Sequence, residues 1–285
     1  MAKKKLMIHE LYKMKAEGQK ITWLTAYDYP TAQFAEAAGM DMLLVGDSLG
    51  MCVYGYSGTV PVTMDQCIVH SEAVRRGAPN TFVIGDMPFM SYQISDSSAV
   101  YNAGRFLKEA SVDAIKLEGG VRVTSRIKAI VEAGIVVCGH IGLTPQSSGQ
   151  LGGHKAQGRT VESAKLVIED ALAVQNAGAQ MLLVEAVPPE VTGFITRKLH
   201  IPVLSIGAGA DCDGQLLIVS DMIGQFTAFT PKFVKKYANV AEVITNAMKE
   251  YVADVREGRF PTDEYCYHII QGEEEKFQEL FKQYE

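Results

Sequence analysis

The feature that most constrains the fold of this chain is a repeating unit: a short apolar run, a turn with Gly or an acidic residue, and then an amphipathic segment. The apolar runs are rich in Val, Ile and Leu and show no regular alternation with polar residues. This pattern is typical of strands that are buried on both faces of a parallel sheet. It predicts strands at 21–28, 41–48, 81–88, 113–120, 135–142, 179–187 and 201–209, and an eighth near 216–224.

Helical periodicity occupies the intervals between these strands. The clearest segments are 30–39, 96–110, 121–134 and 162–178. Several of them open with Asp, Ser or Thr and end at Gly, as helix starts and stops do. About eight strand–helix units without a break in composition favour a closed (β/α)8 TIM barrel, with a doubly wound open sheet as the alternative.

The length of 285 residues suits a single barrel domain, 1–285, with extensions at both ends, because such a barrel takes about 250 residues. We expect residues 6–18 to form an N-terminal helix that can close the bottom of the barrel. Residues 257–285 are expected to form a C-terminal arm or a loosely packed surface helix. The polar, Gly-rich stretch 144–160 is long enough to be a functional lid or a disordered loop.

Charge and cysteine content exclude several classes of protein. The net charge is −6, whereas a nucleic-acid-binding domain is normally basic. The densest basic run, Lys3-Lys4-Lys5, is expected to be a solvated terminus. Five scattered cysteines without a CxxC pair argue against a disulfide framework and a thiolate zinc site. No apolar stretch is long enough for a signal peptide or a membrane span, so we expect a soluble cytoplasmic protein.

Acidic residues at the ends of the predicted strands are the most informative chemical signal. They are Asp28, Asp47, Asp86, Glu118 and Glu185, on strands one, two, three, four and six. In a barrel they would gather at the carboxyl end of the strands, where the active sites of this fold are built. Two carboxylates about 4 Å apart repel by roughly 4 kcal/mol at an effective dielectric near 20, so such a cluster needs a cation or a shared proton. Asp28 is equally well explained as a helix cap and is left out of the predicted site.

The ligand types favour a hard divalent metal ion. Oxygen ligands without neighbouring Cys or His favour Mg²⁺ first and Mn²⁺ next. Lys116 precedes Glu118 by two residues, so both face the same side of strand four, and its charge favours an anionic substrate. His140, at the end of strand five, is a further candidate at the barrel mouth. These residues predict a metal-dependent enzyme that polarises the keto oxygen of a small carboxylate and removes an adjacent proton.

A competing motif is 46-GDSLG-50, which matches the GxSxG nucleophile elbow and the GDSL string of a hydrolase family. A serine hydrolase also needs a His base and an acid that orients it. In the GDSL family the serine lies on the first strand and a DxxH pair follows near the end. Here the motif ends the second strand, and the late pair Asp263 and His268 is spaced DxxxxH. We therefore prefer the metal-dependent interpretation and keep hydrolysis as an alternative.

Eight sequence strings resemble the ketopantoate hydroxymethyltransferase (3-methyl-2-oxobutanoate hydroxymethyltransferase) family almost from end to end. They are 25-TAYDYPTA-32, 44-LVGDSLGM-51, 59-TVPVTMD-65, 85-GDMPFMSYQ-93, 115-IKLEGG-120, 139-GHIGLTPQS-147, 205-SIGAG-209 and 212-CDGQ-215. Departures are minor; His154 stands where an aromatic residue is common. The resemblance implies a barrel that transfers a hydroxymethyl group from 5,10-methylenetetrahydrofolate to 3-methyl-2-oxobutanoate (α-ketoisovalerate). The product is ketopantoate, in the first committed step of pantothenate biosynthesis.

The resemblance also implies roles for individual residues and an assembly. The metal ligands of the family, for one Mg²⁺ per subunit, fall on Asp47, Asp86 and Glu118. Contacts to the keto acid fall on Asp47, Ser48, Asp86 and Lys116, and the proton acceptor falls on Glu185, giving an enolate that the metal stabilises. Family members form large homo-oligomers, commonly decamers. Two rivals stay open: a related barrel of the phosphoenolpyruvate mutase and isocitrate lyase type that cleaves C–C or C–P bonds, and a non-catalytic barrel that binds metabolites.

Overall fold

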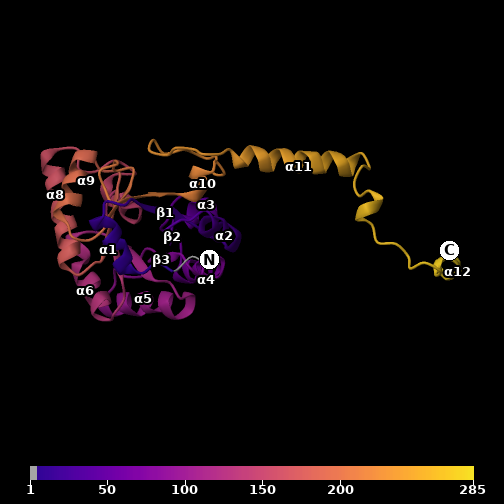
Figure 1. The fold of residues 1–285 in the computed structure, drawn as a ribbon, viewed down its shortest axis with the longest axis horizontal. Helices are drawn as coiled ribbons and strands as arrows, with labels where there is room; N and C mark the ends of the chain where they lie inside the picture. Colours follow the sequence, from indigo (N-terminus) through magenta and orange to yellow (C-terminus); the bar gives the residue numbers. More distant parts are fainter. Residues whose placement is uncertain (1–4) are drawn as a thin grey trace. The chain divides into compact units, whose positions relative to one another are not determined.

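In a computed structural model that describes residues 5–285, eight parallel strands form a closed barrel in the order β1 to β8 (Figure 1). Met1–Lys4, which include two lysines of the basic run, lie outside the described residues. The strands are β1 (Ile21–Thr25), β2 (Met42–Val45), β3 (Phe82–Asp86), β4 (Ala114–Glu118), β5 (Val137–Gly142), β6 (Met181–Glu185), β7 (Val203–Ile206) and β8 (Gly214–Leu217). The prediction of a (β/α)8 TIM barrel is confirmed.

Helices separate consecutive strands from β1 to β7, and in the described chain a loop without a helix joins β7 to β8. Helices α5, α6, α8 and α9 lie on the outside of the barrel (Figure 1). The helices are α1 (Ile8–Ala16), α2 (Tyr29–Ala37), α3 (Leu49–Cys52), α4 (Met64–Gly77), α5 (Asp96–Ala110), α6 (Thr124–Glu132), α7 (Ser148–Leu151), α8 (Val161–Asn176), α9 (Pro189–Lys198), α10 (Val219–Met222), α11 (Val240–Arg256) and α12 (Glu274–Lys282). Short 3₁₀ turns are η1 (Val121–Val123), η2 (Pro145–Ser147) and η3 (Asp263–Tyr265).

The eighth strand differs from its predicted position. It was expected near 216–224, but β8 spans Gly214–Leu217 and the residues after it fold into the short helix α10. Gly214 pairs with Ile21 in β1, and a Cβ at Gly214 would lie 2.2 Å from the Ile21 carbonyl oxygen. The strand therefore starts at a residue whose lack of a side chain permits close approach to β1. The apolar pattern did not predict this start of β8, because glycine does not contribute to an apolar run.

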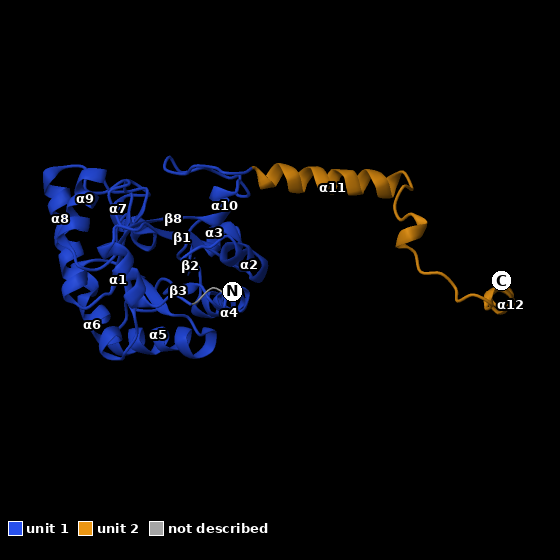
Figure 2. Cartoon of the chain, in the orientation of Figure 1, with its two compact units in different colours: residues 1–238 blue, residues 239–285 orange. Residues whose placement is uncertain are grey.

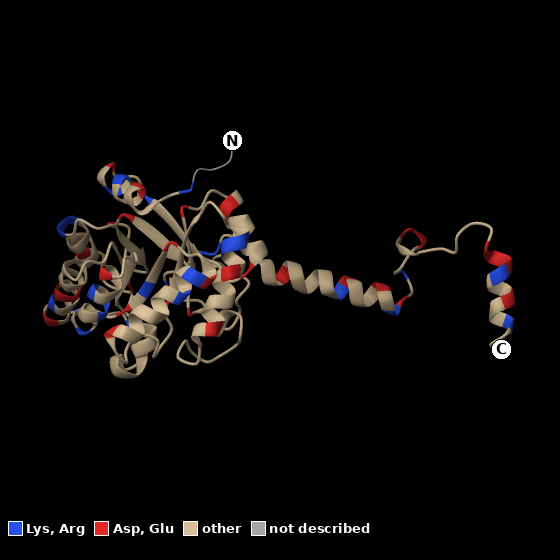
Figure 3. Cartoon of the chain, turned by 90° about the horizontal axis from the view of Figure 1, so that it is seen from below, with Lys and Arg blue, Asp and Glu red and all other residues tan. Residues whose placement is uncertain are grey.

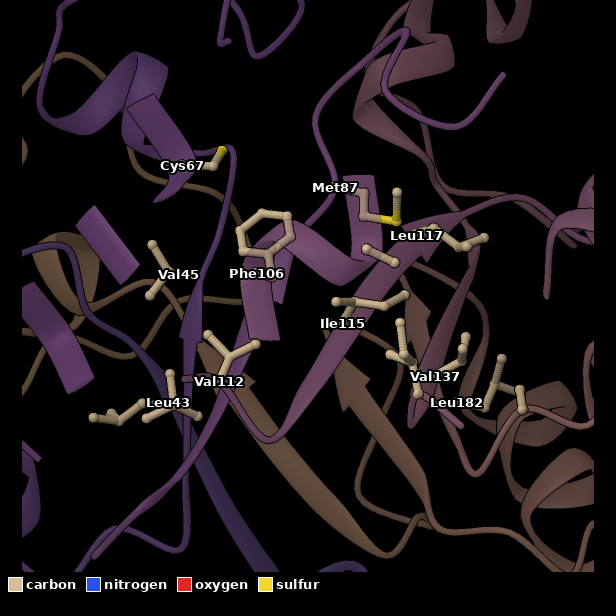
Figure 4. Packing of buried hydrophobic residues seen from close by; sticks show 14 of the residues in the cluster. Leu43, Val45, Cys67, Met87, Phe106, Val112, Ile115, Leu117, Val137 and Leu182 are labelled. Atoms are coloured by element: carbon tan, nitrogen blue, oxygen red, sulfur yellow. The ribbon is translucent and has the colours of Figure 1, made fainter. Parts of the chain in front are cut away.

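Two apolar clusters account for the continuous hydrophobic runs of the strands, which are buried on both faces. The outer cluster lies between the strands and the helices and includes Val45, Ile115 and Phe106 of α5 (Figure 4). The inner cluster fills the barrel with one or two residues from each strand. Its members include Leu11 and Met14 of α1, so this helix covers the amino-terminal end of the barrel as expected for residues 6–18.

The chain divides into two compact units, residues 1–238 and 239–285 (Figure 2). The first contains the barrel; the second contains α11, η3 and α12. The expected C-terminal arm, 257–285, lies within the second unit, and the expectation of one domain stays a prediction. On the barrel unit, Lys and Arg positions are interspersed with Asp and Glu positions along the outer helices (Figure 3).

Candidate active site

Five predicted site residues extend the inward-facing rows of the barrel interior beyond its apolar layers. They are Asp86 of β3, Lys116 and Glu118 of β4, His140 of β5 and Glu185 of β6. Two residues earlier on the same strands lie the inner-cluster residues Ile84, Ala114, Cys138 and Leu183. Because alternate residues of a strand face the same side, the apolar pattern places these polar side chains over the core at the carboxyl end.

Lys116 contacts two of the acids. Its Nζ lies 2.8 Å from both carboxylate oxygens of Asp86 and 3.4 Å from Oε1 of Glu118. These three side chains are at most 3% exposed. Burial lowers the pKa of Lys116, but the surrounding carboxylates outweigh that effect and hold the pKa well above its ordinary value. Lys116 therefore supplies a positive charge at the centre of the site.

Asp47 lies just beyond β2 and joins the same cluster. Its backbone N–H donates to Oδ2 of Asp86 at 3.0 Å, and its own Oδ2 accepts from Nε2 of Gln146 at 2.9 Å. Burial, and secondarily the negative charge of Asp86, raises the pKa of Asp47 to about 8. The carboxyl is thus short of positive charge, which an additional cation at this position would supply.

His140 lies between two acids from neighbouring strands. Its Nδ1 is 3.4 Å from Oε1 of Glu118 and its Nε2 is 3.1 Å from Oε2 of Glu185, both at ion-pair distance but without hydrogen-bond alignment. Burial and Lys116 lower the pKa of His140, but the two carboxylates outweigh them and raise it to about 9. The imidazolium links Glu185, whose side chain is 14% exposed, to the buried acids.

Glycine permits the loop after β5 to pass close to Glu185. Gly142 has a positive φ of 87°, and a Cβ there would lie 2.4 Å from the carbonyl oxygen of Glu185. The next residue, Leu143, donates its backbone N–H to that same oxygen at 2.9 Å. A side chain at position 142 would break this contact, so Gly142 positions the strand end that presents Glu185.

Ser48 follows Asp47 in the chain. Its hydroxyl contacts a tyrosine and not the histidine base that a serine hydrolase requires. Its Oγ lies 2.8 Å from the hydroxyl of Tyr27, a residue of the 25-TAYDYPTA-32 string. Among residues 5–285, no histidine hydrogen-bonds to Ser48. Asp28 caps α2 by accepting the backbone N–H of Thr31 at 2.7 Å, in agreement with the helix-cap interpretation of its sequence position.

Two polar residues that sequence reasoning missed connect the acids to one another. Gln146 is 5% exposed; its backbone N–H donates to Oε2 of Glu118 at 3.0 Å, and its Nε2 donates to Asp47 and to the carbonyl oxygen of Met87. The hydroxyl of Tyr92 accepts the backbone N–H of Glu118 at 3.1 Å and donates to Oε1 of Gln146 at 2.7 Å. This chain of donors and acceptors fixes the Gln146 amide with its NH₂ group toward Asp47. Both residues occur in the strings 85-GDMPFMSYQ-93 and 139-GHIGLTPQS-147, which were the available signal.

Replacing Gln146 with Met tests this relay through stability. Met has a similar volume but no amide, so the Asp47 carboxylate, the Tyr92 hydroxyl and the Met87 carbonyl all lose a partner while buried. Each buried polar group left unpaired costs about 1–3 kcal/mol, and we expect the free energy of unfolding to fall by roughly 2–5 kcal/mol. Urea denaturation measures it. The matched control, Gln33→Met on the exposed surface of α2, should change it by less than about 0.5 kcal/mol.

The acids suit a divalent cation by their charge and oxygen chemistry, but they do not form a finished metal site. Within the described part of the chain, no three His, Cys, Asp or Glu side chains converge closely enough to hold a metal ion. Lys116 instead contacts both Asp86 and Glu118. When Asp47, Asp86, Glu118 and Glu185 are ionised, Lys116 and protonated His140 leave two negative charges uncompensated. One divalent ion would balance them.

The structure therefore brings six predicted residues into one continuous set of contacts, with Ser48 beside it. Those six are Asp47, Asp86, Lys116, Glu118, His140 and Glu185. Their roles toward metal and substrate stay predictions. Among residues 5–285, no helix is both long enough and apolar enough to span a bilayer.

The fold and the site together define a (β/α)8-barrel protein with a buried cluster of acids and lysine at the carboxyl end of its strands. Phosphonopyruvate hydrolase, solved in complex with oxalate and Mg²⁺, has a similar fold, with a TM-score of 0.60 at 13% identity over 98% of each chain. Another is 2,3-dimethylmalate lyase, a PEP mutase/isocitrate lyase superfamily member, with a TM-score of 0.58 at 16% identity over 96% of this chain and 92% of that one. At this identity the likeness concerns the fold alone.

Sequence comparison gives the family. The chain belongs to the ketopantoate hydroxymethyltransferase family, whose sequence profile matches residues 5–263. A protein of Alkaliphilus metalliredigens (strain QYMF) named 3-methyl-2-oxobutanoate hydroxymethyltransferase is 68% identical over 284 residues, covering 100% of both chains. One of the same name from Moorella thermoacetica is 51% identical over 263 residues, covering 92% of this chain and 98% of that one. The resemblance noted in the sequence is confirmed.

Proposed function

We propose that this protein transfers a hydroxymethyl group from 5,10-methylenetetrahydrofolate to 3-methyl-2-oxobutanoate, giving ketopantoate for pantothenate biosynthesis. The observation that supports this most is the line of contacts from Asp47 through Lys116 and His140 to Glu185, in a chain of this family. These contacts place a cationic group that can bind an anionic substrate, Lys116, in the same site as a carboxylate that can accept a proton, Glu185. The donor releases its methylene carbon as tetrahydrofolate forms, and one water supplies the new hydroxyl.

Each residue then has a defined task. Lys116 and the Ser48 hydroxyl bind the keto-acid carboxylate, and Asp47 and Asp86 contribute further contacts. Glu185 accepts the proton from C3, so the C–H electron pair moves into the enolate, whose C3 then forms the bond to the methylene carbon. Asp47, Asp86 and Glu118 would hold one Mg²⁺ per subunit, and this ion, when bound, draws electron density from the keto oxygen. His140 holds Glu185 next to the acids.

We also propose that the protein acts in the cytoplasm as a homo-oligomer, a decamer by resemblance to the family. Light scattering on the purified protein measures that size.

Turnover of α-ketoisovalerate with the folate donor tests the function directly. We expect ketopantoate to accumulate with one tetrahydrofolate released per product. A barrel that cleaves C–C or C–P bonds would leave the keto acid unchanged and consume a different substrate, and a non-catalytic barrel would bind it without turnover. The absence of ketopantoate, with the keto acid bound, would contradict the proposal.

Ser48→Ala separates the transferase from a serine hydrolase. The transferase loses one hydrogen bond to the substrate carboxylate, which costs about 1.5–3 kcal/mol and raises KM by roughly 10- to 150-fold with little loss of kcat. A hydrolase would lose its nucleophile and nearly all ester turnover. Steady-state kinetics with both substrate types distinguish the two, and covalent labelling of Ser48 by a fluorophosphonate would favour the hydrolase.

A further inference from the structure

A pocket opens beside the acid cluster, between the loops that follow β3, β4 and β5. Its volume is about 350 Å³, within the range of small-molecule sites. Glu118, Tyr92 and Gln146 line it on the side of the acid cluster. Arg122 and Arg126, from η1 and α6, line it as well. A ligand that fills the pocket would therefore contact both the predicted metal-binding acid Glu118 and two arginines.

The two arginines are short of anionic partners. Arg122 donates to Oε1 of Gln150 at 2.9 Å and to Oγ of Ser147 at 2.6 Å, both neutral acceptors. No carboxylate of the described chain lies within 4.0 Å of the Arg122 guanidinium, although the Arg122 charge acts on the carboxyl of Asp170 and partly offsets the rise in pKa that burial causes there. Arg126 donates to the hydroxyl of Ser125 at 2.7 Å and to the carbonyl oxygen of Gln93 at 3.2 Å. Among residues 5–285 it forms one ion pair, with the half-exposed Asp96 at 3.4 Å. Guanidinium groups bind carboxylates with two parallel hydrogen bonds, so this pair favours an anionic ligand.

The keto acid does not need these arginines. Its one carboxylate is already assigned to Lys116 and Ser48 inside the barrel. The folate donor, in contrast, carries its reactive methylene group near one end and a glutamate tail with two carboxylates at the other. The donor also has aromatic rings between its two ends. The half-buried Phe89 lines the pocket and presents an aromatic surface that suits these rings.

We propose that this pocket is the donor site, in which Arg122 and Arg126 bind the glutamate carboxylates of 5,10-methylenetetrahydrofolate. The proposal rests on the proposed function for the identity of the donor. According to this proposal, the segments after β4 and β5 determine whether the protein prefers folate to a donor that lacks the glutamate tail. The alternative is that Arg122 only holds the loop at Ser147 and Gln150.

The test compares a donor with the tail and one without it, on wild type, Arg122→Ala and Arg126→Ala. We expect each substitution to raise KM for 5,10-methylenetetrahydrofolate at least about tenfold, as for loss of a charged hydrogen bond. KM for 5,10-methylenetetrahydropteroate, which lacks the glutamate, and KM for the keto acid should stay within twofold of wild type. Lys128→Ala, on the same helix but outside the pocket and paired with Glu132, is the matched control and should change none of these constants.

A binding measurement keeps this inference separate from the proposed function. Calorimetry with tetrahydrofolate and tetrahydropteroate measures the contribution of the tail without turnover. The protein could bind tetrahydrofolate more tightly than tetrahydropteroate, with this preference lost in the arginine variants, and yet make no ketopantoate. That result would contradict the proposed function but support the assignment of the pocket to the donor. If wild type turns over and the variants show equal increases in KM for both donors, the arginines only support the loop. If the variants raise KM for the keto acid alone, the arginines lie in the keto-acid subsite instead. Either result overturns the inference.

Discussion

Glu185→Gln is expected to lower the exchange of the C3 hydrogen of α-ketoisovalerate with D₂O by about 10²- to 10⁴-fold, the usual effect of losing a general base. Gln keeps the size and shape of Glu but cannot accept the proton. The carboxylate lies at the end of β6, 3.1 Å from Nε2 of His140, and its partial exposure leaves it open to a substrate in the barrel mouth. Proton NMR follows the exchange in the presence of Mg²⁺ and without folate, because the proton leaves before the C–C bond forms.

Two comparisons make this result specific. Binding of the keto acid to Glu185→Gln should stay close to wild type, so that the loss is one of rate. Glu190→Gln, on the exposed start of α9, is the matched control and should exchange at the wild-type rate. If Glu185→Gln also exchanges at that rate, Glu185 is not the base.

Removal of divalent ions is expected to abolish turnover, and Mg²⁺ should restore it. The physical reason is that two negative charges stay uncompensated when all four carboxylates around Lys116 and His140 are ionised, while burial keeps water from screening them. Asp86→Ala removes one anionic ligand and also the main partner of Lys116, so added Mg²⁺ should fail to rescue it.

A spectroscopic readout makes the metal prediction independent of activity. Mn²⁺ binding followed by electron paramagnetic resonance should show one ion per wild-type subunit and at least tenfold weaker binding in Asp86→Ala, since one lost charge contact is worth about 1.4 kcal/mol or more. Asp65→Ala, which removes an exposed acid of α4, is the control and should bind Mn²⁺ like wild type. Full activity in excess chelator would contradict the prediction.

Much of the site was predictable because it follows from local rules. Strand ends in a parallel barrel meet at one rim, so acids at the ends of several runs had to lie near one another. Alternation along β4 placed Lys116 and Glu118 on the same inward face, as expected from their spacing of two residues. The cap at Asp28 also followed a local rule, because the carboxylate of an N-cap reaches the N–H three residues later.

The contacts that join distant segments could not be predicted in the same way. Nζ of Lys116 lies closer to Asp86, 30 residues away, than to Glu118 on its own strand. Gln146 reaches Asp47 across 99 residues, and its side chain belongs to a stretch that its composition described only as a polar loop. Composition does not distinguish a buried amide from an exposed one. It also does not show which acid a given lysine contacts.

The sequence by itself therefore determined the barrel, the helix that closes its amino-terminal end, the family, and the rim at which the acids gather. Those features depend on apolar periodicity, strand direction and short strings, which are properties of neighbouring residues. Only the tertiary structure decided how the acids share Lys116 and His140, how Tyr92 orients Gln146 toward Asp47, and where two arginines border the pocket. Those features depend on distances between chain segments and on burial, which turns each unpaired charge or amide into a free-energy cost that its neighbours must relieve.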